Sequence, residues 1–236
     1  MELQHEYIDR ICPESEIWNE LLTLDGADIL ELGCGRAELT RQIAANCNGC
    51  RITAMEVDDI QHAKNLQITD LPNVRFVAGG SEAIPAEDSS FDVVFMFKSL
   101  HHVQPDKMDW AMSDMRRVLR PGGHVYISEP IFAGDFNEIL RLFHDEEQVR
   151  KAAFEAVKRA VEDGRFRLVD EVFFQSRMFF RDFADFEEKV IAVTHSNHQL
   201  SDALYEPVRQ SFNMVMTANG AHFLMPMRVD LLKVVK

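Results

Sequence analysis

The chain has 236 residues, which is long enough for one large domain or two small ones with a substantial buried core. Hydrophobic residues make up 46% of the chain and charged residues 27%, which is ordinary for a globular protein. The formal net charge of −14 disfavours a nucleic-acid partner, because an acidic surface repels a phosphate backbone. No apolar run approaches the roughly 18 residues of a membrane span, and no signal peptide is recognisable, so we expect a cytoplasmic protein.

The cysteines give little indication of a metal site. Cys47 and Cys50 have the spacing of a zinc-binding pair, but no second Cys or His pair follows at the distance that zinc fingers require. We therefore expect no bound metal, and we expect the cysteines to be free thiols, as is usual in the cytosol.

Short apolar strands alternate with helices through the first half of the chain. The first 22 residues predict a helix that is polar and then amphipathic, interrupted at Pro13. Strands are predicted at 28–31, 51–56, 74–77, 91–97 and 124–128. Helices are predicted at 36–46, 59–66 and 105–119, the last of them ended by the turn at 121–123. Helices between successive strands favour an α/β fold with a mostly parallel sheet and helices on both faces.

The second half of the chain is predicted to be richer in helix. A long helix is expected over 134–163, where Ala and Val residues at helical spacing would face the core. A strand over 166–180, helices at 182–194 and 201–218, and a last strand at 223–235 follow. Because no repeat or low-complexity linker is present, we expect one domain over 1–236. Its core would span about 25–130, with additions at about 1–22, 134–163 and 182–218.

A glycine-containing turn lies between the first predicted strand and the helix after it. Gly33 and Gly35 let the chain turn sharply and let a ligand approach closely, and the helix start offers free N–H groups. Glu56 ends the next predicted strand, where a carboxylate can accept from both hydroxyls of an adenosine ribose. The alternative for the two glycines is a plain tight turn, and the alternative for Glu56 is a solvated acid. The occurrence of both features in this order favours a cofactor site.

Two classes of adenosine cofactor fit this arrangement. A nicotinamide dinucleotide places its pyrophosphate over the glycines, whereas S-adenosylmethionine places an ammonium group there. Glu31 lies two positions before Gly33, and a carboxylate so close would repel a pyrophosphate but attract an ammonium group. The sequence therefore favours S-adenosylmethionine over a nicotinamide cofactor.

Six segments follow one another in a characteristic order. They are 29–35, Glu56, 79–85, 90–94, 100–103 and 119–123, and together they span roughly residues 25–130. In this order they resemble the class I S-adenosylmethionine-dependent methyltransferases, of the small-molecule group that includes the ubiquinone and menaquinone biosynthesis enzymes. The resemblance implies a Rossmann-like sheet of seven strands whose last strand is antiparallel, with the added helices covering the substrate side.

The resemblance also implies roles for the residues around the glycine turn. Glu31, Gly33, Cys34 and Gly35 would surround the methionine end of the cofactor, and Glu56 would hold its ribose.

Other matching positions would contact the adenine and the sulfur. Val57 would pack on the face of the adenine, and Ser81 and Glu82 would lie beside it. Phe97 and Lys98, at the end of the fourth strand, would border the sulfonium through their backbone groups.

Two positions depart from the family pattern. Ala37 stands in place of the third glycine of the turn and is small enough to fit. Gly80 stands where the family usually has an acid that accepts from the adenine amino group. Glu82 or a water molecule are the alternative partners for that amino group.

The acceptor side is less well defined by the sequence. Methyl transfer depends mainly on position and on a dry pocket, and it needs a general base only where the acceptor arrives protonated. His101 and His102 follow the fourth strand and are the candidate catalytic residues, with packed or capping histidines as the alternative. Glu129 ends the fifth strand near the same edge.

Several residues of the second half are weaker candidates for substrate contact. Three of them are the histidines His144, His195 and His198. The Met and Phe residues are expected mostly in the core, with a minority lining an apolar acceptor pocket: Phe173, Phe174, Met178, Phe179, Phe180, Met214, Met216 and Met225.

We expect methyl transfer from S-adenosylmethionine to a small or lipid-like organic acceptor, with S-adenosylhomocysteine as the product. One alternative is a cofactor-binding module without catalysis, which Gly80 favours. A protein or RNA methyltransferase is the other, and the negative charge argues against RNA.

Overall fold

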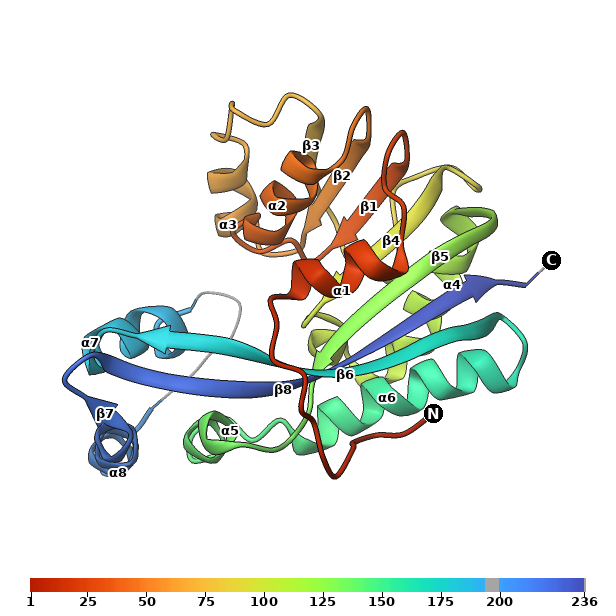
Figure 1. Ribbon diagram of the computed structural model, residues 1–236. Helices are drawn as coiled ribbons and strands as arrows, with labels where there is room; N and C mark the ends of the chain where they lie inside the picture. Colours follow the sequence, from red (N-terminus) through yellow and green to blue (C-terminus); the bar gives the residue numbers. More distant parts are fainter. Residues whose placement is uncertain (194–199, 236) are drawn as a thin grey trace.

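The computed structural model describes residues 1–193 and 200–235, which form a mixed α/β structure around one sheet (Figure 1). The strands follow the order β3-β2-β1-β4-β5-β8-β6, and a short strand β7 pairs with β8. Their bounds are β1 Asp28–Leu32, β2 Arg51–Glu56, β3 Val74–Ala78, β4 Phe91–Phe97, β5 Leu119–Pro130, β6 Phe166–Phe180, β7 Met216–Thr217 and β8 Gly220–Val234. Strands β1 to β5 are parallel, and β8 is antiparallel to β5 and β6. The predicted mostly parallel sheet with an antiparallel last strand is confirmed, but the sheet of the described residues has eight strands instead of the expected seven, because the short β7 pairs with β8.

Helices cover both faces of this sheet because its central strands are apolar on both sides. Side chains alternate along β1, so Ile29 packs with α1 (Glu14–Leu21) and α2 (Glu38–Asn46). Leu30 packs on the opposite face with α4 (Met108–Val118) and α6 (Glu147–Glu162). Helix α3 (Asp59–Asn65) contacts β2 and β3. No helix in the described part of the chain is both long and apolar enough to cross a membrane.

A third cluster of side chains lies at the far end of β6 and β8, which continue beyond the parallel strands (Figure 1). Helices α5 (Asp135–Leu140), α7 (Phe183–Phe186) and α8 (Asp202–Met214) surround it, together with a π-helical turn at Glu187–Ile191. Its rings meet mostly edge to face, an arrangement that aromatic quadrupoles favour: Phe136, Phe180, Phe186, Phe212 and Phe223. This aromatic cluster is separate from the two cores that pack on the sheet.

The prediction of a helix over residues 1–22 is wrong before Pro13. Proline disfavours a helical conformation in the residue that precedes it, and only α1 after it is helical. The first residues instead run alongside β6. Gln175 donates from its backbone N–H to Arg10 O at 2.8 Å, and Cys12 donates to Gln175 O at 3.2 Å.

The predicted long helix over 134–163 is also wrong, because two helices, α5 and α6, occupy that segment. The chain breaks between them, and Asp145 accepts a hydrogen bond from the backbone N–H of Glu147 at 3.0 Å at the start of α6. The break matters for function because it turns His144 and Glu146 toward the cavity described below. The next predicted helices are shorter than expected, and β7 begins soon after α8 ends.

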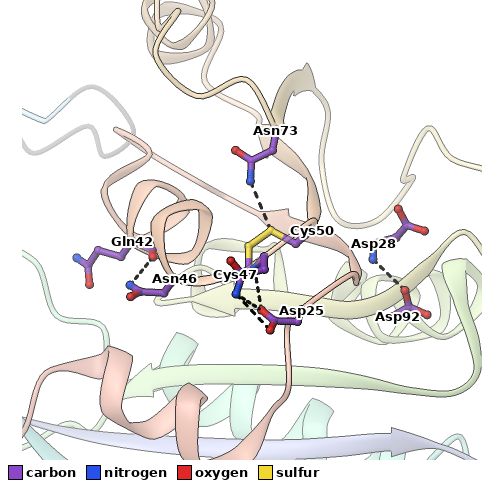
Figure 2. The surroundings of a disulfide bond; sticks show 9 residues. Asp25, Asp28, Gln42, Asn46, Cys47, Cys50, Asn73 and Asp92 are labelled. Atoms are coloured by element: carbon purple, nitrogen blue, oxygen red, sulfur yellow. Dashed lines mark hydrogen bonds between the residues drawn. A yellow bond between two sulfur atoms is a disulfide. The ribbon is translucent and has the colours of Figure 1, made fainter.

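Cys47 and Cys50 form a disulfide in the loop between α2 and β2, so the expectation that all cysteines are free thiols is wrong for this pair (Figure 2). Gly49, with φ of 69°, turns the chain between them and brings their Cα atoms within 5.8 Å. Cys12 and Cys34 are free and buried, as expected.

Candidate active site

One cavity of about 1030 Å³ lies at the carboxyl ends of β1, β2 and β4. Ligands of open parallel sheets usually bind at this edge. Every residue that the sequence singles out for the cofactor or for catalysis lines it: Glu31, Gly33, Cys34, Gly35, Glu56, Val57, Gly80, Ser81, Glu82, Phe97, Lys98, His101 and His102. His195 and His198 lie outside the described residues.

The glycine turn is fixed by close backbone contacts. Gly33 and Cys34 both donate to the carbonyl of Met55 on β2, each at 2.9 Å. Gly33 has φ of +73°, and a Cβ there would lie 2.8 Å from the Cβ of Ser99, so a side chain does not fit. Ala37, which replaces the third glycine, adopts φ of 59° at the start of α2 and so takes the left-handed conformation that glycine adopts more easily.

Glu56 is buried at the end of β2 and accepts three backbone hydrogen bonds. Its Oε2 accepts from Gly35 at 2.7 Å, and its Oε1 accepts from Val57 at 2.9 Å and from Asp58 at 3.0 Å. These bonds join the glycine turn to the loop that leads into α3. Glu56 therefore shapes the site in addition to facing it.

Glu31 is buried at the end of β1, with its Oε2 accepting a hydrogen bond of 2.5 Å from the Thr40 hydroxyl of α2. Burial raises the pKa of this carboxyl to about 7, the Thr40 bond lowers it in part, and the charge of Glu56 raises it further. A cation bound nearby would favour the ionised form.

Asn65 of α3 supports the same turn, and sequence reasoning missed it. Its buried amide donates to Gly35 O at 2.7 Å and to the Cys34 sulfur at 3.5 Å. Burial raises the pKa of the Cys34 thiol far above its ordinary value, so this cysteine is not a nucleophile. No sequence pattern links Asn65 to the turn, because the contact depends on how α3 packs.

The loop after β3 carries an acid close to Gly80. A Cβ built at Gly80 would lie 2.5 Å from Oε2 of Glu82, so this carboxylate occupies the space beside the glycine. Gly80 does not have a positive φ. Lys107 lies 3.6 Å from the other oxygen of Glu82.

Strand β4 ends at the buried Phe97, and the exposed Lys98 follows it in a left-handed turn. The ring of Phe97 stacks on Phe95 with centroids 5.1 Å apart and meets Trp18 edge to face. Lys98 has φ of 51°, and its N–H donates to Ser128 O at 2.7 Å. Both residues still line the cavity.

His101 is buried and lies between two carboxylates. Its Nδ1 pairs with Oε2 of Glu129, whose Oε1 accepts from the N–H of Leu100 at 2.8 Å. Its Nε2 lies 3.6 Å from Oε1 of Glu146. Burial opposes a charge on the ring, but Glu129 and Glu146 outweigh it and raise the pKa of His101 to about 9. This shift favours the protonated ring, which is poorly suited to act as a general base.

Polar side chains gather on one part of the cavity lining, which we call the polar floor: His101, His102, His144, Glu146 and Arg150. The sequence did not indicate Glu146 or Arg150. Arg150 donates to Oε2 of Glu146 at 2.6 Å and to Oδ1 of Asn137 at 3.1 Å. His144 lies 3.0 Å from Oε1 of Glu146. The single helix predicted over 134–163 would have placed Glu146 in its middle. In the structure Glu146 instead precedes the first residue of α6, at the break between α5 and α6.

The opposite wall of the cavity is apolar and comes from the aromatic cluster and its surroundings. It includes Phe136, Leu140, Met178, Phe179, Phe180 and Met225. Of the late Met and Phe residues, Phe174 is buried as expected, whereas Met214 is 85% exposed. The expected minority that line a pocket are thus Met178, Phe179, Phe180 and Met225.

Comparisons with known proteins relate part of the chain to methyltransferases. Residues 29–123 match the methyltransferase-domain family. The O-methyltransferase rstn1 of Aspergillus nomiae is 32% identical over 57% of this chain and 61% of its own length. The ubiquinone/menaquinone biosynthesis C-methyltransferase UbiE of Hahella chejuensis is 33% identical over 51% of this chain and 49% of its own length. The chain thus spans about half to three fifths of these relatives.

A solved structure extends the likeness of fold to most of the chain. The S-adenosylmethionine-dependent methyltransferase of Methanosarcina mazei superposes with a TM-score of 0.57 at 15% identity. The superposition covers 93% of this chain and 97% of that protein.

Proposed function

We propose that the chain is a class I S-adenosylmethionine-dependent methyltransferase that methylates a small or lipid-like organic acceptor held in the 1030 Å³ cavity. The observation that carries this proposal is the pair of buried carboxyls, Glu31 and Glu56, on either side of the glycine turn. A proposed single domain over 1–236 accompanies it, since β6 and β8 join the aromatic cluster to the central sheet.

The residues present fit the cofactor. Glu31 lies beside the turn, where the ammonium of the methionine end would neutralise a buried carboxyl. Glu56 already accepts from three backbone donors, but a carboxylate has about four lone-pair sites, so about one site remains for a ribose hydroxyl. Two carboxyls at this position disfavour a pyrophosphate.

S-adenosylmethionine supplies a methyl group on a positively charged sulfur. The chain's own residues orient the two reactants and exclude water from them. The left-handed turn at Lys98 shapes the backbone at the end of β4, from which the chain leads to His101 and His102, and all three residues line the cavity. Phe136, Met178 and Phe180 give the part of the cavity proposed for the acceptor an apolar wall, which favours a reaction that removes charge.

The acceptor half combines an apolar wall with a polar floor. Phe180 and Met225 suit an apolar body, and His102 and Glu146 suit a polar reacting group. A relative named as an O-methyltransferase and another named as a ubiquinone/menaquinone biosynthesis C-methyltransferase support this class of acceptor. A protein or RNA acceptor is the alternative to be tested.

The direct test measures binding and transfer separately. S-adenosylhomocysteine should raise the melting temperature and NADH should not, and a ligand at 100 times its Kd stabilises by about 2.7 kcal/mol. Isotope-labelled methyl groups should then appear on small-molecule acceptors in extracts and not on RNA or protein. Stabilisation by NADH alone would overturn the cofactor assignment. Tight binding of S-adenosylhomocysteine without labelling of any acceptor would favour a non-catalytic binding module.

A further inference from the structure

Three metal-ligating side chains converge on the polar floor of the cavity. One ligand atom from each of His101, His102 and Glu146 lies within 4.8 Å of the other two. The histidines follow β4, and Glu146 comes from the break before α6. All three residues line the cavity, so an ion among them would be reachable from it.

The carboxylate of Glu129 orients His101 as a metal ligand. Because Glu129 pairs with Nδ1, the other nitrogen, Nε2, is the atom that faces Glu146 at 3.6 Å. Metal-bound histidines usually have their second ring nitrogen paired with a carboxylate or carbonyl in this way. The backbone N–H of Leu100 in turn fixes Glu129 at 2.8 Å.

Glu146 is held in a matching orientation. Two nitrogens of Arg150 lie at 2.6 Å and 3.1 Å from its Oε2, which leaves Oε1 directed toward His101 and His144. Arg150 is itself fixed by Asn137 and by the carbonyl of Ile131. A metal ion at Nε2 would displace the proton from that nitrogen of His101, and the two carboxylates Glu129 and Glu146 would then face the ion together with the single positive charge of Arg150.

We propose that His101, His102 and Glu146 bind a divalent transition-metal ion at the floor of the acceptor cavity. Two imidazoles and one carboxylate suit Zn²⁺, Mn²⁺, Fe²⁺ or Co²⁺ better than Ca²⁺ or Mg²⁺, which prefer sets of oxygen ligands. Three protein ligands leave coordination positions open toward the cavity. This departs from the expectation of no metal, which considered only the spacing of the cysteines.

The position of the ion restricts the acceptor, and this step rests on the proposed function. The histidines follow directly after the Phe97–Lys98 turn, and both segments line one cavity. An acceptor with a hydroxyl or carbonyl oxygen would complete the coordination and be oriented by it. The acceptor class is therefore an apolar molecule with an oxygen-bearing reactive end.

The test titrates the tag-free 236-residue chain, stripped by a chelator, with Co²⁺ and with Zn²⁺. Equilibrium dialysis and the visible absorption of Co²⁺ should show one ion per chain. His102→Ala and Glu146→Gln should each weaken binding at least tenfold. His102 is exposed, so its loss should not unfold the protein. His5→Ala is the matched control, since His5 is exposed and does not line the cavity.

Absence of Co²⁺ and Zn²⁺ binding by the wild type would overturn the proposal, as would wild-type affinity in both variants or equal weakening by His5→Ala. S-adenosylhomocysteine is titrated against the wild type in parallel, so that the metal site and the proposed function are tested separately. If the wild type binds metal but not S-adenosylhomocysteine, the metal site stands and the proposed function fails. If the reverse occurs, only the metal site fails.

Discussion

The carboxylate of Glu82 lies beside Gly80, so close that a Cβ at Gly80 would be 2.5 Å from Glu82 Oε2. The family pattern has an acid at the position of Gly80, and here an acid two residues later fills that space. The acid has therefore moved along the loop rather than disappeared, and Glu82 is the candidate partner of the adenine amino group.

Glu82→Gln should weaken binding of S-adenosylhomocysteine by roughly tenfold, since a hydrogen bond to a charged group is worth about 1.5–3 kcal/mol. Glu82 is partly exposed and lies on a loop, so the melting temperature should change little. Calorimetric titration measures the affinity. Glu87→Gln, an exposed acid that does not line the cavity, is the control. Unchanged affinity in Glu82→Gln would leave adenine recognition to backbone groups or water.

Gly80→Asp should not tighten cofactor binding, although the family pattern alone predicts that it restores a hydrogen bond. The backbone at Gly80 accepts a side chain, because its φ is not positive. The new carboxylate, however, would displace Glu82 and place a second negative charge beside it. Calorimetry should show equal or weaker affinity for S-adenosylhomocysteine, with Gly80→Ala separating displacement from charge. A several-fold gain in affinity would show that Glu82 does not serve the adenine.

The parts of the site that the sequence predicts are those encoded locally. A strand, a glycine turn and a helix follow one another at β1 and α2, so Glu31, Gly33 and Gly35 could be placed from their order alone. Periodicity likewise places the parallel strands. The polar floor could not be predicted, because Glu146 depends on a break in a segment whose apolar spacing indicates one continuous helix. At the break, Glu146 pairs locally with Arg150 four residues later and makes a tertiary contact to His101, and no local pattern reports the contact to His101.

Affinity for S-adenosylhomocysteine should rise as the pH increases from 5 to 7, by at most about tenfold per pH unit. The pKa of Glu31 is raised to about 7 chiefly by burial, so the carboxyl must lose a proton before it can attract the ammonium group. Calorimetry across this range measures the slope. In Glu31→Gln the affinity should be lower and should not vary with this titration. A flat wild-type profile would contradict a contact between Glu31 and the ammonium group.

The same shift affects the stability of the ligand-free protein. The folded-state pKa of about 7 exceeds the unfolded value near 4.5, so the folded state binds the extra proton between these values. The contribution of Glu31 to stability therefore falls as the pH rises from 4.5 to 7 and is constant above that. Relative to wild type, Glu31→Gln should gain stability over this range, which thermal melts at several pH values would show.

Glu56→Ala should lower both cofactor affinity and stability. Sequence reasoning expects only the loss of affinity, but the structure adds three backbone donors that lose their acceptor. An unsatisfied buried donor costs about 1–3 kcal/mol, so the melting temperature should fall on the order of 5 °C. Glu38→Ala, an exposed acid that also lines the cavity, should leave stability nearly unchanged. Equal melting temperatures for Glu56→Ala and wild type would mean that water replaces the carboxylate.

Asn65→Ala should loosen the glycine turn and weaken S-adenosylhomocysteine binding several-fold, although Asn65 does not line the cavity. Its amide is 1% exposed and bonds to Gly35 O at 2.7 Å, so the variant leaves a carbonyl of the turn without this donor. Asn65→Asp should be worse, because it places a carboxylate against that carbonyl. Asn46→Ala, which removes an exposed amide bonded only within α2, is the control. Hydrogen exchange of the backbone amides around Gly35 should increase in Asn65→Ala and not in the control. Unaltered exchange together with unaltered affinity would show that the bonds of Glu56 alone hold the turn.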